Sequence, residues 1–179
     1  MNDPITKEGQ KVTVRQPTEK DAEGIINYSK ILFASTDQVL TTLEEYTITV
    51  AQEKTWINNF SKSPNSLLLI AEFDQQIVGL LFFSGNTKKK NAHTGEFGIS
   101  VHPDFQRLGI GRHLLETLLT WARENKTIEK IFLNVFSTNT KAIKLYDDVG
   151  FVEEGRHVKA IRQPSGEYVD VLQMYIGTK

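Results

Sequence analysis

Two glycines, one residue apart, stand directly before a helical pattern of leucines in the stretch HPDFQRLGIGRHLLETLL, residues 102–119. The first N–H groups of a helix have no carbonyl partner within the helix, and they carry partial positive charge. Because a glycine leaves the backbone uncovered, Gly109 and Gly111 predict a loop that binds a phosphate group. The same spacing also fits a tight strand-to-helix turn that needs only the dihedral freedom of glycine.

Several other kinds of chemistry do not fit the residues present. A dinucleotide fingerprint would place a third glycine at position 114, which is Leu114, and a P-loop would require Gly-Lys-Ser/Thr. The chain contains no cysteine and therefore has neither a disulfide nor a thiol nucleophile. Its four histidines show no paired metal-ligand spacing, and no Gly-x-Ser-x-Gly turn indicates a serine hydrolase. We expect no metal at the site.

The composition indicates a nearly neutral globular chain. The 179 residues are 39% hydrophobic and carry a formal net charge of −1. These values predict one domain over residues 1–179, with no attraction to nucleic acid or to an anionic membrane. No segment approaches the roughly 20 apolar residues that a membrane span needs, and residues 1–10 lack the basic start and apolar run of a signal peptide. The expected compartment is the cytoplasm.

The spacing of apolar residues predicts alternating strands and helices. Thr18 precedes the first helical pattern as a candidate cap, and Gly150 ends the last one. Asp74-Gln75 separates two apolar runs as a hairpin turn, although it is not the favoured Asn-Gly pair, and RQPSG separates two more. Strands are expected at 11–16, 66–73, 75–85, 93–101, 131–136, 151–161 and 167–176, and helices at 17–33, 52–60, 110–122 and 140–149.

These elements predict an α/β fold of the α+β type, in which a mixed, mostly antiparallel sheet of about seven strands is flanked by about four helices. The three strands between residues 66 and 101 should form an antiparallel meander. Side chains alternate across a strand, so Glu96 and Ser100 should lie on one face of the third strand, opposite Phe97 and Val101.

Two longer patterns accompany the glycine pair. Gln106-x-x-Gly109-x-Gly111 follows a strand that ends at Val101. The downstream stretch NTKAIKLYDDVGF, residues 139–151, combines an asparagine, a helix tyrosine and a Gly-Phe entry to the next strand. In this order, the two stretches resemble the two signatures of the GNAT superfamily of acyl-CoA-dependent N-acetyltransferases. The order of strands and helices resembles that family over nearly the whole chain, which implies acetyl-CoA as the cosubstrate.

The resemblance also implies where acetyl-CoA binds. Its pyrophosphate would lie on the backbone amides from Leu108 to Arg112. Its pantetheine arm would follow the strand before the loop, where two neighbouring strands would separate near Val101 and Phe132. Ordinary surface charge for the two arginines, and helix capping for Asn139, are open alternatives. The expected cofactor-binding residues are Ile99, Ser100, Val101, Gln106, Arg107, Leu108, Gly109, Ile110, Gly111, Arg112 and Asn139.

Two residues are candidates for the proton transfers of acetylation. An amine with a pKa near 10.4 must lose a proton before it attacks, which costs roughly 4 to 5 kcal/mol at pH 7. Glu96, or a water molecule that it holds, is the candidate base, and the resemblance implies Tyr146 as the acid for the leaving thiolate. A solvated Glu96 and a core Tyr146 are the structural alternatives. At another position where some family members carry a glutamate, this chain has Asn134.

The predicted function is transfer of an acetyl group from acetyl-CoA to a primary amine within a ternary complex. The acceptor is a small amine or amino acid, or a protein amine, and the resemblance implies that residues 28–60 and 155–170 bind it. Glu44 and Glu45 could attract a cationic amine, and analogy with the family suggests a homodimer. Because Asn134 stands where a glutamate is expected, a non-catalytic sensor or scaffold that only binds acyl-CoA is the alternative function.

Overall fold

A computed structural model of the chain describes residues 11–179, which form one mixed sheet with helices on both faces. The prediction about a signal peptide in residues 1–10 lies outside this range. Within it, the sheet has seven strands, as the sequence predicts. They are β1 (Thr13–Arg15), β2 (Ser66–Phe73), β3 (Gln76–Gly85), β4 (Thr94–Val101), β5 (Lys130–Phe136), β6 (Val152–Arg162) and β7 (Tyr168–Gly177).

The helices lie close to their predicted positions. The first one differs slightly, because its predicted start is a short 3-10 turn in which the carboxylate of Asp21 accepts a hydrogen bond from the Thr18 amide at 2.7 Å. Thr18 therefore marks the start of the helical segment, as expected. The helical segments are η1 (Glu19–Asp21), α1 (Ala22–Ser35), α2 (Val50–Lys62), η2 (Pro103–Phe105), α3 (Ile110–Glu124) and α4 (Thr140–Val149).

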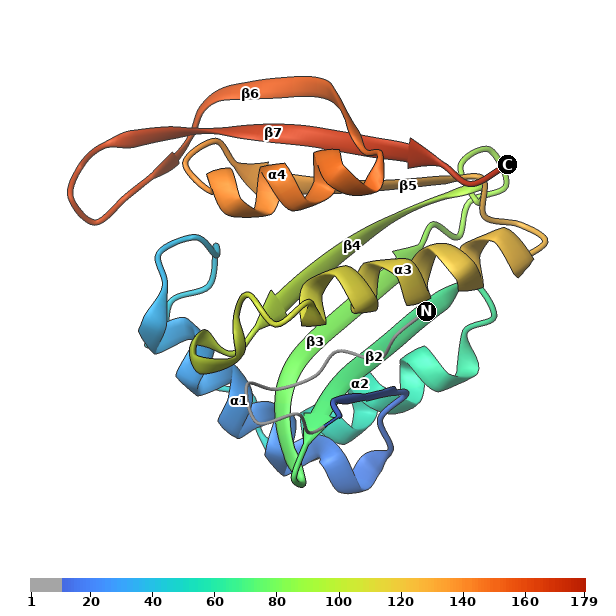
Figure 1. Ribbon diagram of the computed structural model, residues 1–179, viewed down its shortest axis with the longest axis vertical. Helices are drawn as coiled ribbons and strands as arrows, with labels where there is room; N and C mark the ends of the chain where they lie inside the picture. The colour runs from blue at the N-terminus through green and yellow to red at the C-terminus, as the bar shows by residue number, and fades with distance from the viewer. Residues whose placement is uncertain (1–10) are drawn as a thin grey trace.

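The strand order is β1-β2-β3-β4-β5-β7-β6. The meander of β2, β3 and β4 is antiparallel, as predicted, whereas β4 and β5 run parallel. The last hairpin also forms as predicted, but β7 is inserted between β5 and β6, so the final strand of the chain is internal (Figure 1). No local pattern in the sequence specified this insertion.

The two faces of the sheet have separate cores. Figure 1 shows α3 crossing in front of β2, β3 and β4, while α1 and α2 lie behind them. On the α1 side, the hydroxyl of Tyr28 donates a hydrogen bond to Ser100 Oγ at 2.8 Å. On the α3 side, Phe97 belongs to the same hydrophobic cluster as Leu114 and Leu118. The predicted alternation of side chains along β4 is therefore confirmed.

Helix α3 packs through one apolar stripe. Its inward residues, Ile110, Leu114, Leu115, Leu118, Leu119 and Ala122, are all buried against the sheet. Burying a leucine side chain contributes about 1.5–3 kcal/mol, so this stripe supplies a large share of the energy that holds α3 in place. The start of α3, where the glycines lie, is consequently fixed relative to the end of β4.

The turn between β2 and β3 confirms the hairpin prediction, although its two residues are not the usual Asn-Gly pair. Asp74 and Gln75 have φ values of 46° and 62°, so both adopt the left-handed conformation of a type I′ turn. This turn type matches the twist of the flanking strands and usually selects Asn-Gly. Aspartate tolerates the left-handed region better than most residues, while Gln75 adopts it without such a preference.

Arg15 joins the first strand to two other elements. Its guanidinium binds the carboxylate of Asp21 at 2.7 Å and also contacts the carboxylate of Glu72 on β2. The hydrogen bonds from Arg15 are the main reason why the pKa of Asp21 falls to about 2. The cluster fixes the start of α1, and therefore the helix that carries Tyr28, against the edge of the sheet.

Candidate active site

The glycine loop has the geometry expected of an anion-binding helix start. Gly109 is the N-cap of α3 with φ = 83°, and no side chain caps this end of the helix. The first helical hydrogen bond runs from the His113 amide to the Gly109 carbonyl at 3.0 Å, so the amides before His113 have no carbonyl partner within the helix. A Cβ atom at Gly109 would meet nothing within 4 Å, which leaves open space beside this backbone.

Gly111 has a different role from Gly109. A Cβ atom at Gly111 would lie 3.2 Å from Leu145 Cδ2 and 3.7 Å from Val101 Cγ2. Its missing side chain thus allows α4 and the end of β4 to pack closely on the first turn of α3. Gly109 is therefore compatible with both interpretations of the glycine pair, because it has a left-handed backbone and open space beside it, whereas Gly111 permits close packing, which neither interpretation included.

The predicted polar side chains around the loop lie in different settings. Arg107 is exposed and adopts φ = 64°, an unusual value for a residue other than glycine. The Gln106 side chain reaches back and donates a hydrogen bond to the carbonyl of Val101 at 3.4 Å. Arg112 is also exposed, but its guanidinium lies 3.5 Å from the carboxylate of Asp148 on α4. Arg107 is therefore the loop arginine without such an ion pair among residues 11–179.

Strands β4 and β5 separate in front of the loop. Their parallel pairing covers only Thr94 to Glu96 on β4 and Lys130 to Phe132 on β5. From Phe97 to Val101, β4 remains paired with β3 but has no partner on its other edge. The sequence predicted separation near Val101 and Phe132, and the structure places its start at the pair Glu96–Phe132. The free edge includes Ile99, Ser100 and Val101, whose backbone groups can pair with an extended ligand.

Glu96 occupies the point at which the two strands separate. Its side chain is exposed, and its Oε1 accepts a hydrogen bond from Asn134 Nδ2 at 2.8 Å. The residue that departs from the family pattern therefore contacts the candidate base directly. An amide cannot take up a proton at neutral pH, but it can hold a carboxylate in one orientation. The solvated setting expected as the alternative for Glu96 is present, together with this specific partner.

Tyr146 lies on the opposite side of β4. Its side chain is buried, and its ring contacts Phe97 and Phe151 at centroid distances of 5.9 and 6.0 Å. Burial raises the pKa of Tyr146 well above its ordinary value. Its hydroxyl makes no hydrogen bond with another residue of the described range 11–179. Tyr146 therefore lies in the core, as the structural alternative expected. A buried tyrosine hydroxyl normally makes a hydrogen bond, and because this one makes none within the described range, it is available as a donor to a ligand.

Asn139 caps α4. Its Oδ1 accepts a hydrogen bond from the Ala142 amide at 3.3 Å, and the chain enters the helix at Thr140. The capping interpretation is therefore confirmed. Its side-chain NH₂ group remains available as a donor, so capping does not prevent a contact with a ligand on the adjacent strand edge.

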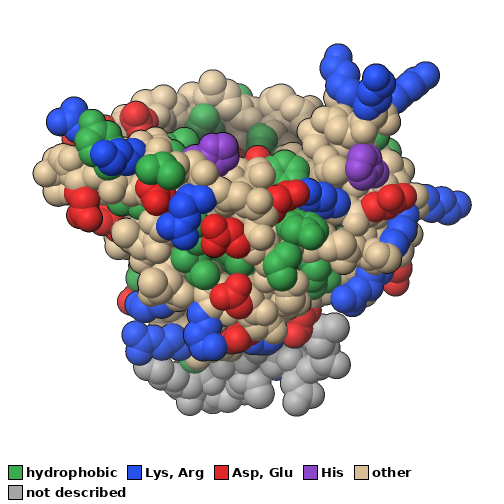
Figure 2. All heavy atoms as spheres, turned by 90° about the horizontal axis from the view of Figure 1, so that it is seen from above, with side chains coloured by type: hydrophobic (Ala, Val, Ile, Leu, Met, Phe, Trp, Pro, Cys, Tyr) green, Lys and Arg blue, Asp and Glu red, His purple; other side chains and the backbone are tan. Residues whose placement is uncertain are grey.

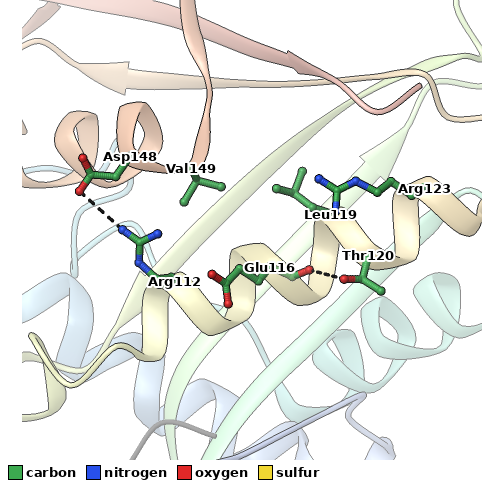
Figure 3. A pocket seen from close by; sticks show the side chains of 7 residues that line it. All are labelled: Arg112, Glu116, Leu119, Thr120, Arg123, Asp148 and Val149. Atoms are coloured by element: carbon green, nitrogen blue, oxygen red, sulfur yellow. Dashed lines mark hydrogen bonds and ion pairs between the residues drawn. The ribbon is translucent and has the colours of Figure 1, made fainter. Parts of the chain in front are cut away.

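Two hollows border this region. Figure 3 shows the first, between α3 and α4, where the side chain of Arg112 points toward Asp148. It has a volume of about 360 Å³ and extends along α3 as far as Arg123. The second, of about 310 Å³, lies where Asp37 and Gln38 of the α1–α2 connection meet Thr138 and Glu167 beyond the ends of β5 and the last hairpin. The second hollow joins the two segments expected to bind the acceptor.

The sequence interpretation missed one residue on the α1–α2 side. Glu53 is only 5% exposed, although it is a carboxylate in the first turn of α2. The available signal was its position, because residues 53, 56, 57 and 60 share one helical stripe and the other three are Trp56, Ile57 and Phe60. A charged residue on an otherwise apolar stripe is a candidate for a functional role.

Together, these features define a class of protein. An uncapped helix start can hold a diphosphate, the adjacent free strand edge can pair with an extended arm, and a carboxylate stands where that edge begins. Such a site fits a ligand that carries a reactive group at the end of a long arm and presents it between two strands.

Comparison with known proteins agrees with this description. The family model described as Acetyltransferase (GNAT) family matches residues 34–151. The L-amino acid N-acetyltransferase AaaT of Escherichia coli is 31% identical over 66% of this chain and 73% of its own length. Spermidine N(1)-acetyltransferase of Vibrio cholerae is 39% identical over 46% of this chain and 47% of its own length. The chain belongs to the GNAT family and is an N-acetyltransferase.

Solved structures show that the fold is shared. An acetyltransferase of the GNAT family from Streptococcus pneumoniae has a TM-score of 0.90 at 24% identity, over 93% of this chain and 99% of that one. An acetyltransferase from Salmonella typhimurium, solved with its cofactor acetyl-CoA, has a TM-score of 0.83 at 20% identity, over 95% of each chain. Acetyl-CoA is the cosubstrate typical of this family.

Other kinds of site receive no support from the surface. In residues 11–179, no group of three histidine, aspartate or glutamate side chains is arranged to hold a metal ion. No helix in the same range is long and apolar enough to cross a membrane. Figure 2 shows Lys, Arg, Asp and Glu side chains interspersed over the face drawn there, rather than one extended basic surface.

Proposed function

We propose that this chain transfers the acetyl group of acetyl-CoA directly to a primary amine while both are bound at the opening between β4 and β5. The single observation that supports this site most strongly is the loss of strand pairing after Glu96, next to the uncapped start of α3. The opening connects the two faces of the sheet, so a thioester can enter from the α3–α4 side and an amine from the α1–α2 side.

The loop residues are assigned to binding. Amides from Leu108 to Arg112 would donate hydrogen bonds to the pyrophosphate, and the open space beside Gly109 admits the phosphate oxygens. Arg107 would add a charge-assisted contact, while Arg112 shares its charge with Asp148. The free edge from Ile99 to Val101 would hold the pantetheine arm, and Gln106 supports the end of that edge.

Glu96 is assigned the role of base. The amine must lose a proton before attack, and the carboxylate of Glu96 can accept it directly or through a water molecule. Asn134 holds one carboxylate oxygen at 2.8 Å, which leaves the second oxygen free for this task. The carboxylate faces the α1–α2 side, where the acceptor approaches, so the proton leaves on the side from which the amine enters.

Tyr146 is assigned the role of hydrogen-bond donor to the leaving sulfur. Burial raises the pKa of Tyr146, so its hydroxyl remains protonated at neutral pH. A thiol has a pKa of about 8.5, so complete proton transfer from this tyrosine to a thiolate would be unfavourable. The hydroxyl therefore acts by donating a hydrogen bond as negative charge develops on the sulfur. This assignment refines the acid role that the family resemblance implied.

The acceptor is assigned to the α1–α2 side of the sheet. The two named relatives acetylate an L-amino acid and spermidine, and a third, the ribosomal protein bS18-alanine N-acetyltransferase of Salmonella typhimurium, is 46% identical over 32% of this chain and 38% of its own length, so the family supplies no single acceptor. In this chain, the hollow between Asp37 and Glu167 is also lined by Thr138, which follows the end of β5. We assign this hollow as the entrance for a small amine or the end of a peptide.

A thiol-release assay tests the proposal. The wild-type protein should release CoA from acetyl-CoA only when a suitable primary amine is present, and Glu96→Gln should lower kcat by about 100-fold or more. The affinity of this variant for acetyl-CoA, measured by calorimetry, should remain within about twofold of wild type. Binding of acetyl-CoA without turnover on any amine would instead support the sensor or scaffold, and a fully active Glu96→Gln would exclude the assigned base.

A further inference from the structure

Glu53 is a buried carboxylate that has no partner in the described structure. It lies in the first turn of α2, one helical turn before Ile57, and both side chains are at least 95% buried. Its Oε1 atom is enclosed and has no hydrogen-bond partner among residues 11–179. No lysine or arginine in that range pairs with it. A buried carboxylate is normally neutralised by a cation or by several donors, so the absence of both requires an explanation.

The surroundings of Glu53 place it on the acceptor side of the sheet. Tyr46, from the α1–α2 connection, is held by Ser29 of α1, and its pKa is raised by burial and also by the negative charge of Glu53. The residue before Ser29 is Tyr28, whose hydroxyl binds Ser100 on β4. Glu53 therefore lies beside Tyr46 of the α1–α2 connection, on the face of the sheet that α1 and α2 cover.

Glu53 and Glu96 belong to different elements, α2 and β4, so Glu53 is a candidate for a second contact rather than for a second base. Asn134 holds Glu96 where β4 and β5 separate, whereas Glu53 lies in the first turn of α2 beside Tyr46. No hydrogen bond joins the two carboxylates to a shared partner in residues 11–179, so a group bound by Glu53 differs from the nitrogen that Glu96 deprotonates.

The hollow assigned as the acceptor entrance, which is lined partly by the same α1–α2 connection that carries Tyr46, has negative charge. Asp37 and Glu167 line it, and none of the lining residues in the described structure is lysine or arginine. Such an entrance favours cationic ligands over anionic ones. The entrance and the buried carboxylate therefore select for the same sign of charge.

We propose that Glu53 binds a second, non-reacting cationic group of the acceptor, so that the preferred acceptors are amines that carry another positive charge several bonds away. This inference rests on the proposed function, because it assigns the acceptor class of the same site. The cation supplies the partner that the buried carboxylate lacks, and the free Oε1 atom accepts its hydrogen bond.

Three amines of equal chain length test the proposal by kinetics. Cadaverine ends in a second ammonium group, pentylamine ends in a methyl group and 5-aminovalerate ends in a carboxylate. For the wild-type protein, kcat/KM should be highest for cadaverine, by at least about 30-fold over pentylamine. The isosteric variant Glu53→Gln should reduce this preference to less than about threefold, mainly by raising KM for cadaverine. The control Glu44→Gln, at an exposed carboxylate of the same connection, should retain the wild-type preference.

Thermal unfolding provides a readout that does not depend on turnover. Glu53→Gln should be at least as stable as wild type, because it removes an unpaired buried charge. Cadaverine should raise the Tm of the wild-type protein and leave that of Glu53→Gln unchanged. Equal kcat/KM for the three amines, or an undiminished preference in Glu53→Gln, overturns the inference while leaving the proposed function intact. Stabilisation by cadaverine without acetylation of any amine supports Glu53 as a cation site and refutes the proposed function.

Discussion

Replacing Tyr146 with phenylalanine removes one hydroxyl from a buried side chain whose ring packs against Phe97 and Phe151. Because this hydroxyl makes no hydrogen bond within residues 11–179, the free energy of unfolding should change by less than about 1 kcal/mol. A hydrogen bond to a charged group contributes about 1.5–3 kcal/mol. If Tyr146 donates such a bond to the leaving sulfur, Tyr146→Phe should lower kcat by about 10- to 150-fold.

The affinity for acetyl-CoA distinguishes this role from simple binding. The proposed hydrogen bond strengthens only as charge develops on the sulfur, so KM for acetyl-CoA should stay nearly constant while kcat falls. Steady-state thiol release measures both parameters, and a denaturant or thermal melt measures stability. A kcat within about twofold of wild type would refute the donor role, and a large loss of stability would identify Tyr146 as a structural core residue.

Two other tyrosines provide matched controls for the same substitution. Tyr168 is 54% exposed on the last hairpin, so Tyr168→Phe should change neither kcat nor Tm. The hydroxyl of Tyr28 donates to Ser100 at 2.8 Å, so Tyr28→Phe should lower the free energy of unfolding by about 1 kcal/mol. The opposite pattern is expected at Tyr146, where the hydroxyl affects rate and leaves stability unchanged.

Three further results are expected. Gly109→Ala forces a left-handed alanine at a cost of about 1–2 kcal/mol and should weaken the binding of acetyl-CoA measured by calorimetry. Gly111→Ala should mainly lower Tm, because the added methyl group crowds α4. Equal losses of binding in the two variants would contradict these separate roles. Asn134→Ala should reduce kcat less than Glu96→Gln does, and a larger loss would show that Asn134 acts on the substrate itself. The pKa of Asp21 in the folded state, about 2, lies below its ordinary value. The stability that the ionised Asp21 contributes is therefore complete above about pH 4 and is lost as the pH falls through 2. Asp21→Asn should lower Tm at pH 7 and should remove this part of the dependence of Tm on acid pH.

Much of the fold could be predicted because its signals are local. The spacing of Leu114 and Leu118 defines the buried stripe of α3, and Gly150 ends α4 with φ = 103°, a value that glycine adopts without strain. The start of α3 at Gly109 is equally local, since only the backbone of a few residues is involved. The start of α3 was therefore located correctly from residues 106–112, and the two signatures indicated the family.

The contacts that define the rest of the site join residues distant in sequence. Glu96 meets Asn134 across 38 positions, and Tyr28 meets Ser100 across 72. The point at which β4 and β5 separate depends on how both strands pair with other neighbours, and β5 pairs on its other edge with β7 from the end of the chain. No periodicity within either segment contains this information.

The sequence by itself determined the helices, the strands and the uncapped turn at Gly109, because short-range backbone preferences and the alternation of apolar side chains specify them. The tertiary structure alone decided where the sheet opens, which partner orients Glu96, and that the carboxylate of Glu53 is enclosed without a cation. The physical reason is that strand pairing and desolvation depend on which distant segments are brought together.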